Sequence, residues 1–319
     1  MTMTGRLRVL ARLSGLLLVA MTPTAAAAAS FAVQDVDPRP AARGGTIAYT
    51  AVDGSGGLRL ALRKGGAVVR LAVPARRRVF DVSLGTDAHQ RQVATFTTCR
   101  NEATMSRGST LPGDRGCSAV AVRTVAGARP RTVLAARGGL SFSYPVMVDG
   151  QVAAVVRDGK RVGLVVGGRG RPLRRIGLQR SVDADPNERG LAFDGRRVVA
   201  TWALSHDACP GRRAVQASAV EWRAEVVGVR DGKRRTLLSD WCDDFANDLG
   251  SPSLVGDRLF VLGVTTRSRL IEVDLRTRKR RIGFFPDVIV SSAAVTSDRI
   301  VYSAASATDS RHELKVVRR

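Results

Sequence analysis

Short runs of apolar residues recur along the chain, each five to seven residues long. Runs of that length bounded by turn residues are typical of β-strands. The six runs begin 46, 59, 46, 61 and 41 residues apart, at 47–52, 93–97, 152–156, 198–204, 259–264 and 300–304. Intervals of about 40 to 50 residues match a four-stranded blade of a β-propeller.

Each interval repeats the same order of elements. A turn such as Asp149-Gly150 or Asp194-Gly195 precedes the apolar run. The run is apolar on both faces, as expected of a strand between neighbouring blades. An alternating strand follows, as at 271–276, where the even-numbered positions are polar. A polar fourth strand then closes the unit, at 68–73, 131–135, 173–178, 235–239 and 280–284.

The sixth unit ends with the strand at 314–317 and lacks its outermost strand, whereas the segment 31–36 has no partner of its own. We expect this segment to join the last blade, because closure removes exposed sheet edges. The sequence therefore predicts an all-β fold, a six-bladed propeller of four-stranded antiparallel blades closed by its N-terminal strand. A large β-sandwich with the same strand spacing is the alternative.

The N-terminus predicts export. Arg6, Arg8 and Arg12 precede the apolar run 13–21, and small residues follow Pro23. This is the layout of a secretory signal, and the apolar run is shorter than the roughly 20 residues that span a bilayer. We assign residues 1–29 to a signal peptide and 30–319 to one propeller domain. The expected product is a secreted monomer without an integral membrane anchor.

Four cysteines in an exported chain favour disulfides over metal. We expect the sequential pairs Cys99–Cys117 and Cys209–Cys242, because crossed pairings would join distant segments. His206, Cys209 and Cys242 also permit a zinc site, although an oxidising compartment favours the disulfide. We expect no resident metal or cofactor.

Three segments resemble the repeat of the TolB-type, WD-like propeller family, namely 147–154, 191–199 and 294–302. The family consensus is Ser-Pro-Asp-Gly, two variable residues and an apolar triplet. The Asp-Gly is intact in two of these segments, and the Pro is missing from all three. The resemblance implies a secreted six-bladed propeller that binds proteins or small ligands, usually without chemistry of its own.

Long segments gather at one end of the predicted propeller. Loops from strand two to three, and from strand four to the next blade, emerge together, and the segments 99–117, 181–190, 205–214 and 240–251 all fall there. Binding residues concentrate on such loops. The candidate ligand-binding residues are Asp183, Asp185, Asn187, Glu188, His206, Asp207, Asp243, Asp244, Asn247 and Asp248. The acidic run 240–248 also permits a calcium ion, but it lacks the spacing of a 12-residue calcium loop.

Enzyme signatures are absent: the chain has no G-x-S-x-G, H-E-x-x-H or Walker motif. We expect a non-catalytic module that binds a protein, a glycan or a cell-envelope polymer. The alternative is a hydrolase or lyase that uses loop carboxylates such as Asp243 and Asp244, with His206.

The net charge of +23 falls to +20 when the arginines of the leader are removed. A surface of this charge favours binding of any polyanion, so tethering to an anionic wall polymer is a third hypothesis. Only five of the 51 cationic residues are Lys, a ratio that codon bias alone can produce, and no aromatic residues interleave the arginine runs. Sequence-specific nucleic-acid binding is therefore not expected.

Overall fold

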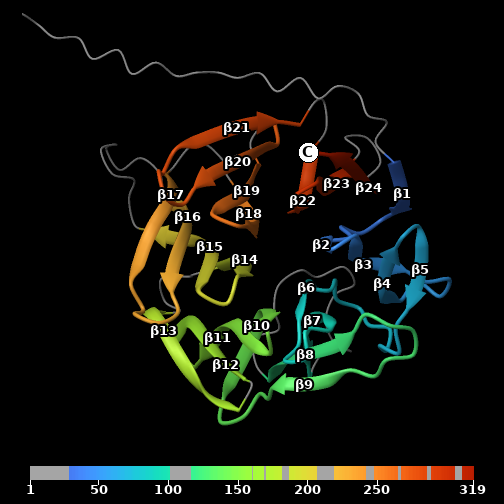
Figure 1. The fold of residues 1–319 in the computed structure, drawn as a ribbon, viewed down its shortest axis with the longest axis horizontal. Helices are drawn as coiled ribbons and strands as arrows, with labels where there is room; N and C mark the ends of the chain where they lie inside the picture. Colours follow the sequence, from blue (N-terminus) through green and yellow to red (C-terminus); the bar gives the residue numbers. More distant parts are fainter. Residues whose placement is uncertain are drawn as a thin grey trace, which may run out of the picture.

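The computed structural model describes residues 29–100, 116–159, 161–168, 170–181, 187–206, 219–241, 248–264, 267–285, 289–305 and 311–319. In these segments every regular element is a β-strand, and the strands form six four-stranded antiparallel sheets. Figure 1 shows the sheets arranged as blades around a common axis. The predicted six-bladed propeller is confirmed, and the β-sandwich is excluded.

The strands of each blade follow one another from the axis outward. The first two blades are β2 (Ala41–Arg43), β3 (Thr46–Val52), β4 (Leu58–Lys64), β5 (Ala67–Arg70) and β6 (Ser83–Thr86), β7 (Gln92–Cys99), β8 (Cys117–Arg123), β9 (Arg131–Leu134). The third and fourth are β10 (Leu140–Val148), β11 (Gln151–Asp158), β12 (Arg161–Gly168), β13 (Arg171–Ser181) and β14 (Asn187–Phe193), β15 (Arg197–His206), β16 (Ala219–Gly228), β17 (Arg234–Trp241). The fifth is β18 (Asp248–Val255), β19 (Arg258–Val264), β20 (Arg269–Asp274), β21 (Arg280–Phe284).

The sixth blade combines the two ends of the described chain. It contains β22 (Ile289–Val295), β23 (Arg299–Ala305) and β24 (His312–Arg318), with β1 (Ala29–Gln34) as its outermost strand. β1 pairs antiparallel with β24, and Ser30 lies opposite Lys315. The predicted closure of the ring by the N-terminal strand is therefore confirmed, and it leaves β24 paired along both edges.

Hydrophobic burial occurs between blades. Along β11, Val152, Ala154 and Val156 pack toward the second blade, whereas Ala153 and Val155 pack toward the fourth. The same alternation gives a separate apolar cluster at every junction between neighbouring blades around the ring. This explains why the second strand of each blade is apolar on both faces, since each face covers a different neighbour.

The cross-link Cys99–Cys117 is present, which confirms one of the two predicted disulfides. The two residues lie directly opposite each other at the ends of β7 and β8. The other predicted pair, Cys209 and Cys242, lies outside the described residues.

Replacing Cys99 and Cys117 together by Ala is expected to lower the free energy of unfolding by about 3 kcal/mol. The disulfide closes a loop of 18 residues, and the chain-entropy model gives that magnitude for such a closure. Urea unfolding followed by tryptophan fluorescence measures the effect. An unchanged unfolding midpoint would show that this cross-link does not stabilise the second blade.

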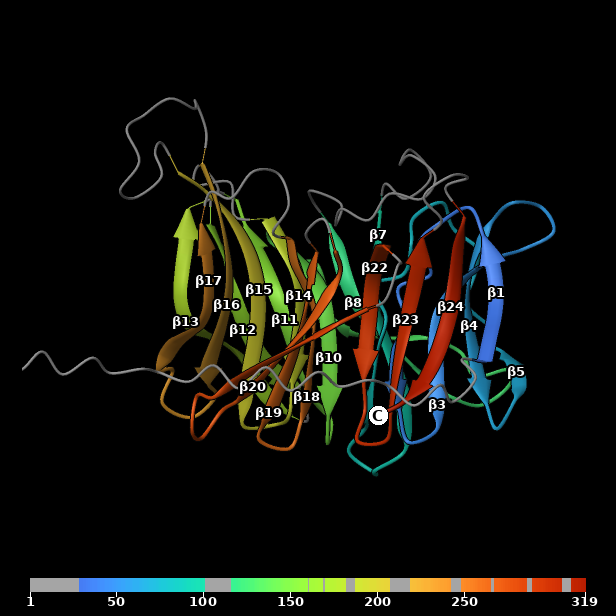
Figure 2. The same cartoon turned by 90° about the horizontal axis from the view of Figure 1, so that it is seen from above.

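The described strand ends confirm that the long connections emerge at one end of the ring. Figure 2 shows the ends of β7, β13, β15 and β17 on the same side. We call this side the long-loop end. The connections between the first and second strands lie at the opposite, short-turn end, as at Asp149-Gly150. No helix long and apolar enough to cross a membrane occurs in the described part of the chain.

Candidate site in the axial channel

A cavity of about 380 Å³ follows the axis of the ring. Its walls come from the innermost strand of every blade and from the residues that precede β2 and β6. The walls carry both apolar side chains, such as Leu84, Val146 and Phe193, and serine hydroxyls. The volume lies toward the lower end of the range for small-molecule sites.

A backbone feature recurs in the wall of this cavity. Arg39, Tyr144 and Ser251 have left-handed backbones, with φ of 43°, 50° and 47°, and each directly precedes a proline. The pairing register shifts around Tyr144 and around Ser251. Such bulges bend a strand and redirect its side chains. They place Tyr144 and Ser251 at the wall of the cavity.

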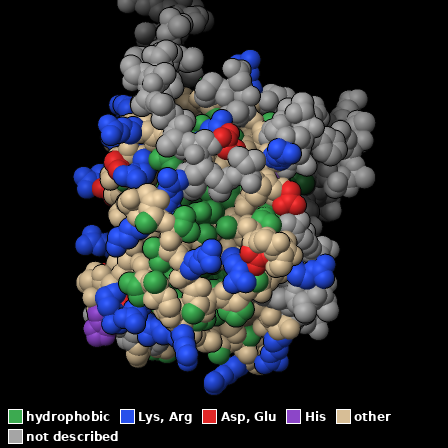
Figure 3. Space-filling view, turned by 90° about the vertical axis from the view of Figure 1, so that its right-hand side faces the viewer, with side chains coloured by type: hydrophobic (Ala, Val, Ile, Leu, Met, Phe, Trp, Pro, Cys, Tyr) green, Lys and Arg blue, Asp and Glu red, His purple; other side chains and the backbone are tan. Residues whose placement is uncertain are grey.

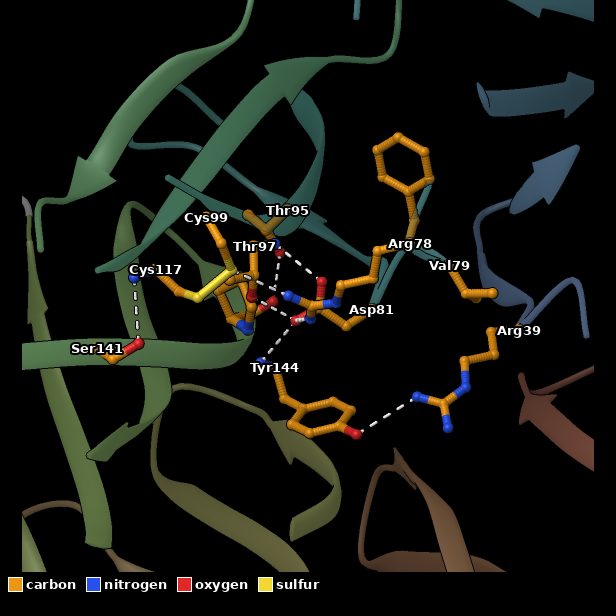
Figure 4. A network of polar contacts seen from close by, with 12 residues as sticks. Arg39, Arg78, Val79, Asp81, Thr95, Thr97, Cys99, Cys117, Ser141 and Tyr144 are labelled. Carbon is orange, nitrogen blue, oxygen red and sulfur yellow. Dashed lines mark hydrogen bonds and ion pairs between the residues drawn. A yellow bond between two sulfur atoms is a disulfide. The ribbon is translucent and has the colours of Figure 1, made fainter. Parts of the chain in front are cut away.

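Five residues form a polar group beside the half of the cavity nearer the long-loop end, which we call the axial cluster: Asp37, Arg39, Asp81, Tyr144 and Ser292. All of them except Asp37 line the cavity. Arg39 Nη1 donates to Tyr144 Oη across 3.3 Å, which links the first blade to the third. Asp37 Oδ1 accepts from Ser292 Oγ at 2.7 Å, which links the sixth blade to the first. Figure 4 shows the Tyr144 ring directed toward the Arg39 guanidinium.

The guanidinium of Arg39 is held in its charged form. Its Nε lies 3.8 Å from Asp37 Oδ2, and the side chain is 22% exposed. Burial opposes the charge, but the Tyr144 hydroxyl and the carboxylates of Asp37 and Asp81 outweigh burial and raise the pKa of Arg39. Arg39 therefore places a permanent positive charge at the cavity wall.

The Asp81 carboxylate fixes the backbone at Tyr144. Asp81 Oδ2 accepts from the Tyr144 backbone N–H at 2.9 Å, and Oδ1 accepts from the Thr97 N–H at 2.9 Å. The Thr97 hydroxyl also donates to Oδ2. These bonds tie the left-handed turn at Tyr144 to the second blade, as Figure 4 shows.

Two buried arginines surround the Asp81 carboxylate. Arg78 Nη2 lies 3.5 Å from Oδ2, and Arg76 Nη2 lies 4.0 Å from Oδ1. Burial raises the pKa of Asp81, but Arg78, Arg76 and Thr97 together outweigh burial and lower this pKa below its ordinary value. Asp81 is therefore ionised at neutral pH and is unsuited to act as a general acid.

A serine and a histidine meet at the long-loop end of the sixth blade. His312 Nδ1 lies 3.3 Å from Ser291 Oγ and 3.2 Å from Ser303 Oγ, and Ser291 lines the axial cavity. A nucleophilic serine needs a base that a third group orients. Among the described residues no carboxylate contacts the His312 ring. The arrangement therefore lacks the orienting group of a catalytic triad.

The structure places only part of the face predicted from the sequence. Asn187 and Glu188 begin β14, His206 ends β15 and Asp248 begins β18, all at the long-loop end. The remaining predicted residues, Asp183, Asp185, Asp207, Asp243, Asp244 and Asn247, lie outside the described residues. The described chain contains no group of three or more His, Cys, Asp or Glu that could hold a metal ion.

Sequence reasoning missed the axial cluster. Its members lie far apart in the chain, since 105 residues separate Arg39 from Tyr144 and 255 separate Asp37 from Ser292. One local signal was present, because a proline follows Arg39, Tyr144 and Ser251 just ahead of an apolar strand.

Comparison with solved structures shows the fold. Similar chains include hydrazine synthase from Kuenenia stuttgartiensis, with 12% identity, a TM-score of 0.50, and coverage of 88% of this chain and 82% of that one. TolB from Acinetobacter baumannii has 11% identity and a TM-score of 0.49, over 86% of this chain and 64% of TolB. The propeller domain of the Trilobed protease from Pyrococcus furiosus has 10% identity and a TM-score of 0.47, over 85% and 79%.

The chain has a β-propeller fold. No family model matches the sequence, and no curated protein matches it. Identities near 10% carry the fold alone. The axial cluster and the surrounding surface must therefore carry any functional argument.

Proposed function

We propose that this protein is a secreted, non-catalytic binding module that receives a protein, glycan or cell-envelope polymer at the long-loop end of its axial channel. The observation that carries the proposal is the axial cluster. It combines a permanent cation with hydroxyl groups at the end where the long connections emerge. The strands β10 and β22 hold Tyr144 and Ser292, and a preformed polar site in an apolar cavity is typical of binding sites.

The chemistry of the described channel favours binding over catalysis. Asp81 is the one carboxylate among the described residues of the cavity wall, and it is occupied by Arg78, Tyr144 and Thr97. An ionised, fully engaged carboxylate neither donates a proton nor accepts one readily at neutral pH. The contact between Ser291 and His312 favours the hydrolase alternative. Assays of the purified protein on ester and glycoside substrates test this alternative.

Blocking one end of the channel is the test of the proposal. Ser291 and Ser297 belong to the same blade, are exposed, and line the cavity at its long-loop and short-turn ends. We expect Ser291→Trp to lower capture of a ligand from cell-envelope extract at least tenfold, and Ser297→Trp to leave capture within twofold. Quantitative pull-down from the extract, with the wild-type protein as the reference, measures capture by both variants.

Three outcomes would contradict the proposal. Equal capture by the two tryptophan variants would place the ligand outside this end of the channel. Turnover of an ester or glycoside that Ser291→Ala abolishes would replace the binding module by a hydrolase. Capture that disappears at about 0.5 M salt in all variants alike would instead indicate tethering through surface charge. Figure 3 shows that Lys and Arg outnumber Asp and Glu on the described surface of one side.

A further inference from the structure

We propose that Arg39 and Tyr144 bind a carboxylate group, carried either by a small organic acid or by the C-terminal end of a peptide. This inference rests on the proposed function, because it names the chemical class that the long-loop end of the channel would take. Hydrogen-bond donors, buried charge and the shape of the cavity support it.

The first support is a pair of donors with no acceptor. Arg39 Nη1 donates to Tyr144 Oη, whereas Arg39 Nη2 makes no hydrogen bond within the described residues. Tyr144 Oη accepts that bond, and its own proton has no acceptor in the same part of the chain. Both groups line the cavity and are only partly exposed to water. Donors held together in this way favour a ligand with acceptor oxygens.

The second support is the presence of buried guanidinium groups beside the cavity. The guanidinium groups of Arg39, Arg76 and Arg78 all lie within 4 Å of the carboxylates of Asp37 or Asp81. Asp81 is already engaged by four residues, namely Thr97, Tyr144, Arg78 and Arg76. Arg78 Nε and Nη2 are buried and make no hydrogen bond. An anion bound at Arg39 would therefore lie near more than one guanidinium group in a region of low dielectric constant.

The third support is the shape of the site. A single guanidinium edge with one hydroxyl beside it matches the two coplanar oxygens of a carboxylate. The cavity of about 380 Å³ accommodates a small group, and Leu84, Val146 and Leu191 line its wall. An apolar tail attached to the carboxylate has room against these side chains. A phosphate or sulfate would carry more charge than this one arginine neutralises.

Matched pairs of probes test the carboxylate directly. The pairs are benzoate with benzamide, and N-acetyl-trialanine with its C-terminal amide. Isothermal titration calorimetry on the full-length protein is expected to show at least one acid binding tenfold or more tightly than its amide. Binding of the peptide acid alone identifies a chain terminus as the ligand, and binding of benzoate alone identifies a small acid.

Variants assign the binding to the proposed residues. Arg39→Met is expected to weaken binding of the acid at least tenfold, because a hydrogen bond to a charged group is lost. Tyr144→Phe is expected to weaken it about threefold to tenfold. Arg43→Met is the control, since Arg43 lines the same cavity at the short-turn end, and its affinity should stay within twofold. If Arg39→Met does not fold, Arg39→Lys and Tyr144→Phe give the answer.

Several results would overturn the inference. These are equal binding of acids and amides, no acid binding at 10 mM, or tighter binding of phosphate with the same dependence on Arg39. Loss of envelope capture in Ser291→Trp but not in Arg39→Met would leave the proposed function standing and remove the carboxylate. Unchanged capture in Ser291→Trp would remove the proposed function, whatever the titrations show.

Discussion

Replacing Asp81 by Asn is expected to lower the free energy of unfolding by about 3 to 5 kcal/mol. Asp81 is buried with Arg78 and Arg76 at 3.5 and 4.0 Å. Removing its charge leaves the buried guanidinium of Arg78 without the carboxylate it faces, and breaking a buried ion pair from one side has that magnitude. Chemical unfolding at pH 7, followed by circular dichroism, measures the loss.

The exposed pair of Asp298 and Arg299 provides the control for Asp81. The Asp298 side chain is 59% exposed, so Asp298→Asn is expected to change the midpoint little. A loss at Asp81 no larger than at Asp298 would show that the buried network does not stabilise the ring.

The pH dependence of unfolding follows from the same network. The pKa of Asp81 is lower in the folded than in the unfolded protein. The contribution of Asp81 to the free energy of unfolding is therefore present above about pH 4, the pKa of an unfolded aspartate. It is lost as the pH falls through the pKa of Asp81 in the folded protein. Stability of Asp81→Asn should fall less steeply with acid than that of the wild type. Parallel acid curves would contradict this assignment.

Replacing Gly85 by Ala is expected to destabilise the protein by about 3 kcal/mol or more. A Cβ at this position would lie 1.7 Å from the backbone carbonyl oxygen of Met147. Met147 belongs to β10 of the next blade, so the clash can be relieved only by separating two innermost strands. Overpacking of this kind costs up to about 3 kcal/mol, and more where backbone must move. Thermal unfolding of the purified variant measures the loss.

Gly283 is the matched control for Gly85. It also lies within a strand, but a Cβ there would meet no atom within 4 Å. We expect Gly283→Ala to keep the melting temperature of the wild type or to raise it slightly, because alanine has less freedom in the unfolded chain. If both alanine variants melted together, the close contact between the second and third blades would be wrong.

The repeating strands could be predicted because their cause is local. Apolar residues on both faces of segments such as 152–156 reflect two neighbouring blades, and this pattern is written into the sequence itself. The role of β1 was predictable for a related reason, since the sixth unit lacked a strand and the N-terminal segment lacked a partner. The Cys99–Cys117 bridge followed from the short loop it closes.

The axial cluster could not be predicted from local pattern. In the sequence, Arg39 resembles many other arginines of this chain. In the folded protein its left-handed backbone directs it toward Tyr144 in the third blade. Asp81 stands three residues after Arg78, which suggests an ordinary surface pair, yet both are buried because the second blade packs over them. The function of such residues depends on how the ring brings distant blades together, and no spacing rule carries that information.

Amide hydrogen exchange along β24 tests the closed ring most directly, and the channel exists only if the ring is closed. Because β24 pairs with both β23 and β1, its amides at 312–318 should exchange as slowly as those of the interior strand β20. The outermost strand β21, paired only with β20, supplies the fast reference within the same protein. Exchange of β24 at the rate of β21 would show that the N-terminal strand does not close the propeller.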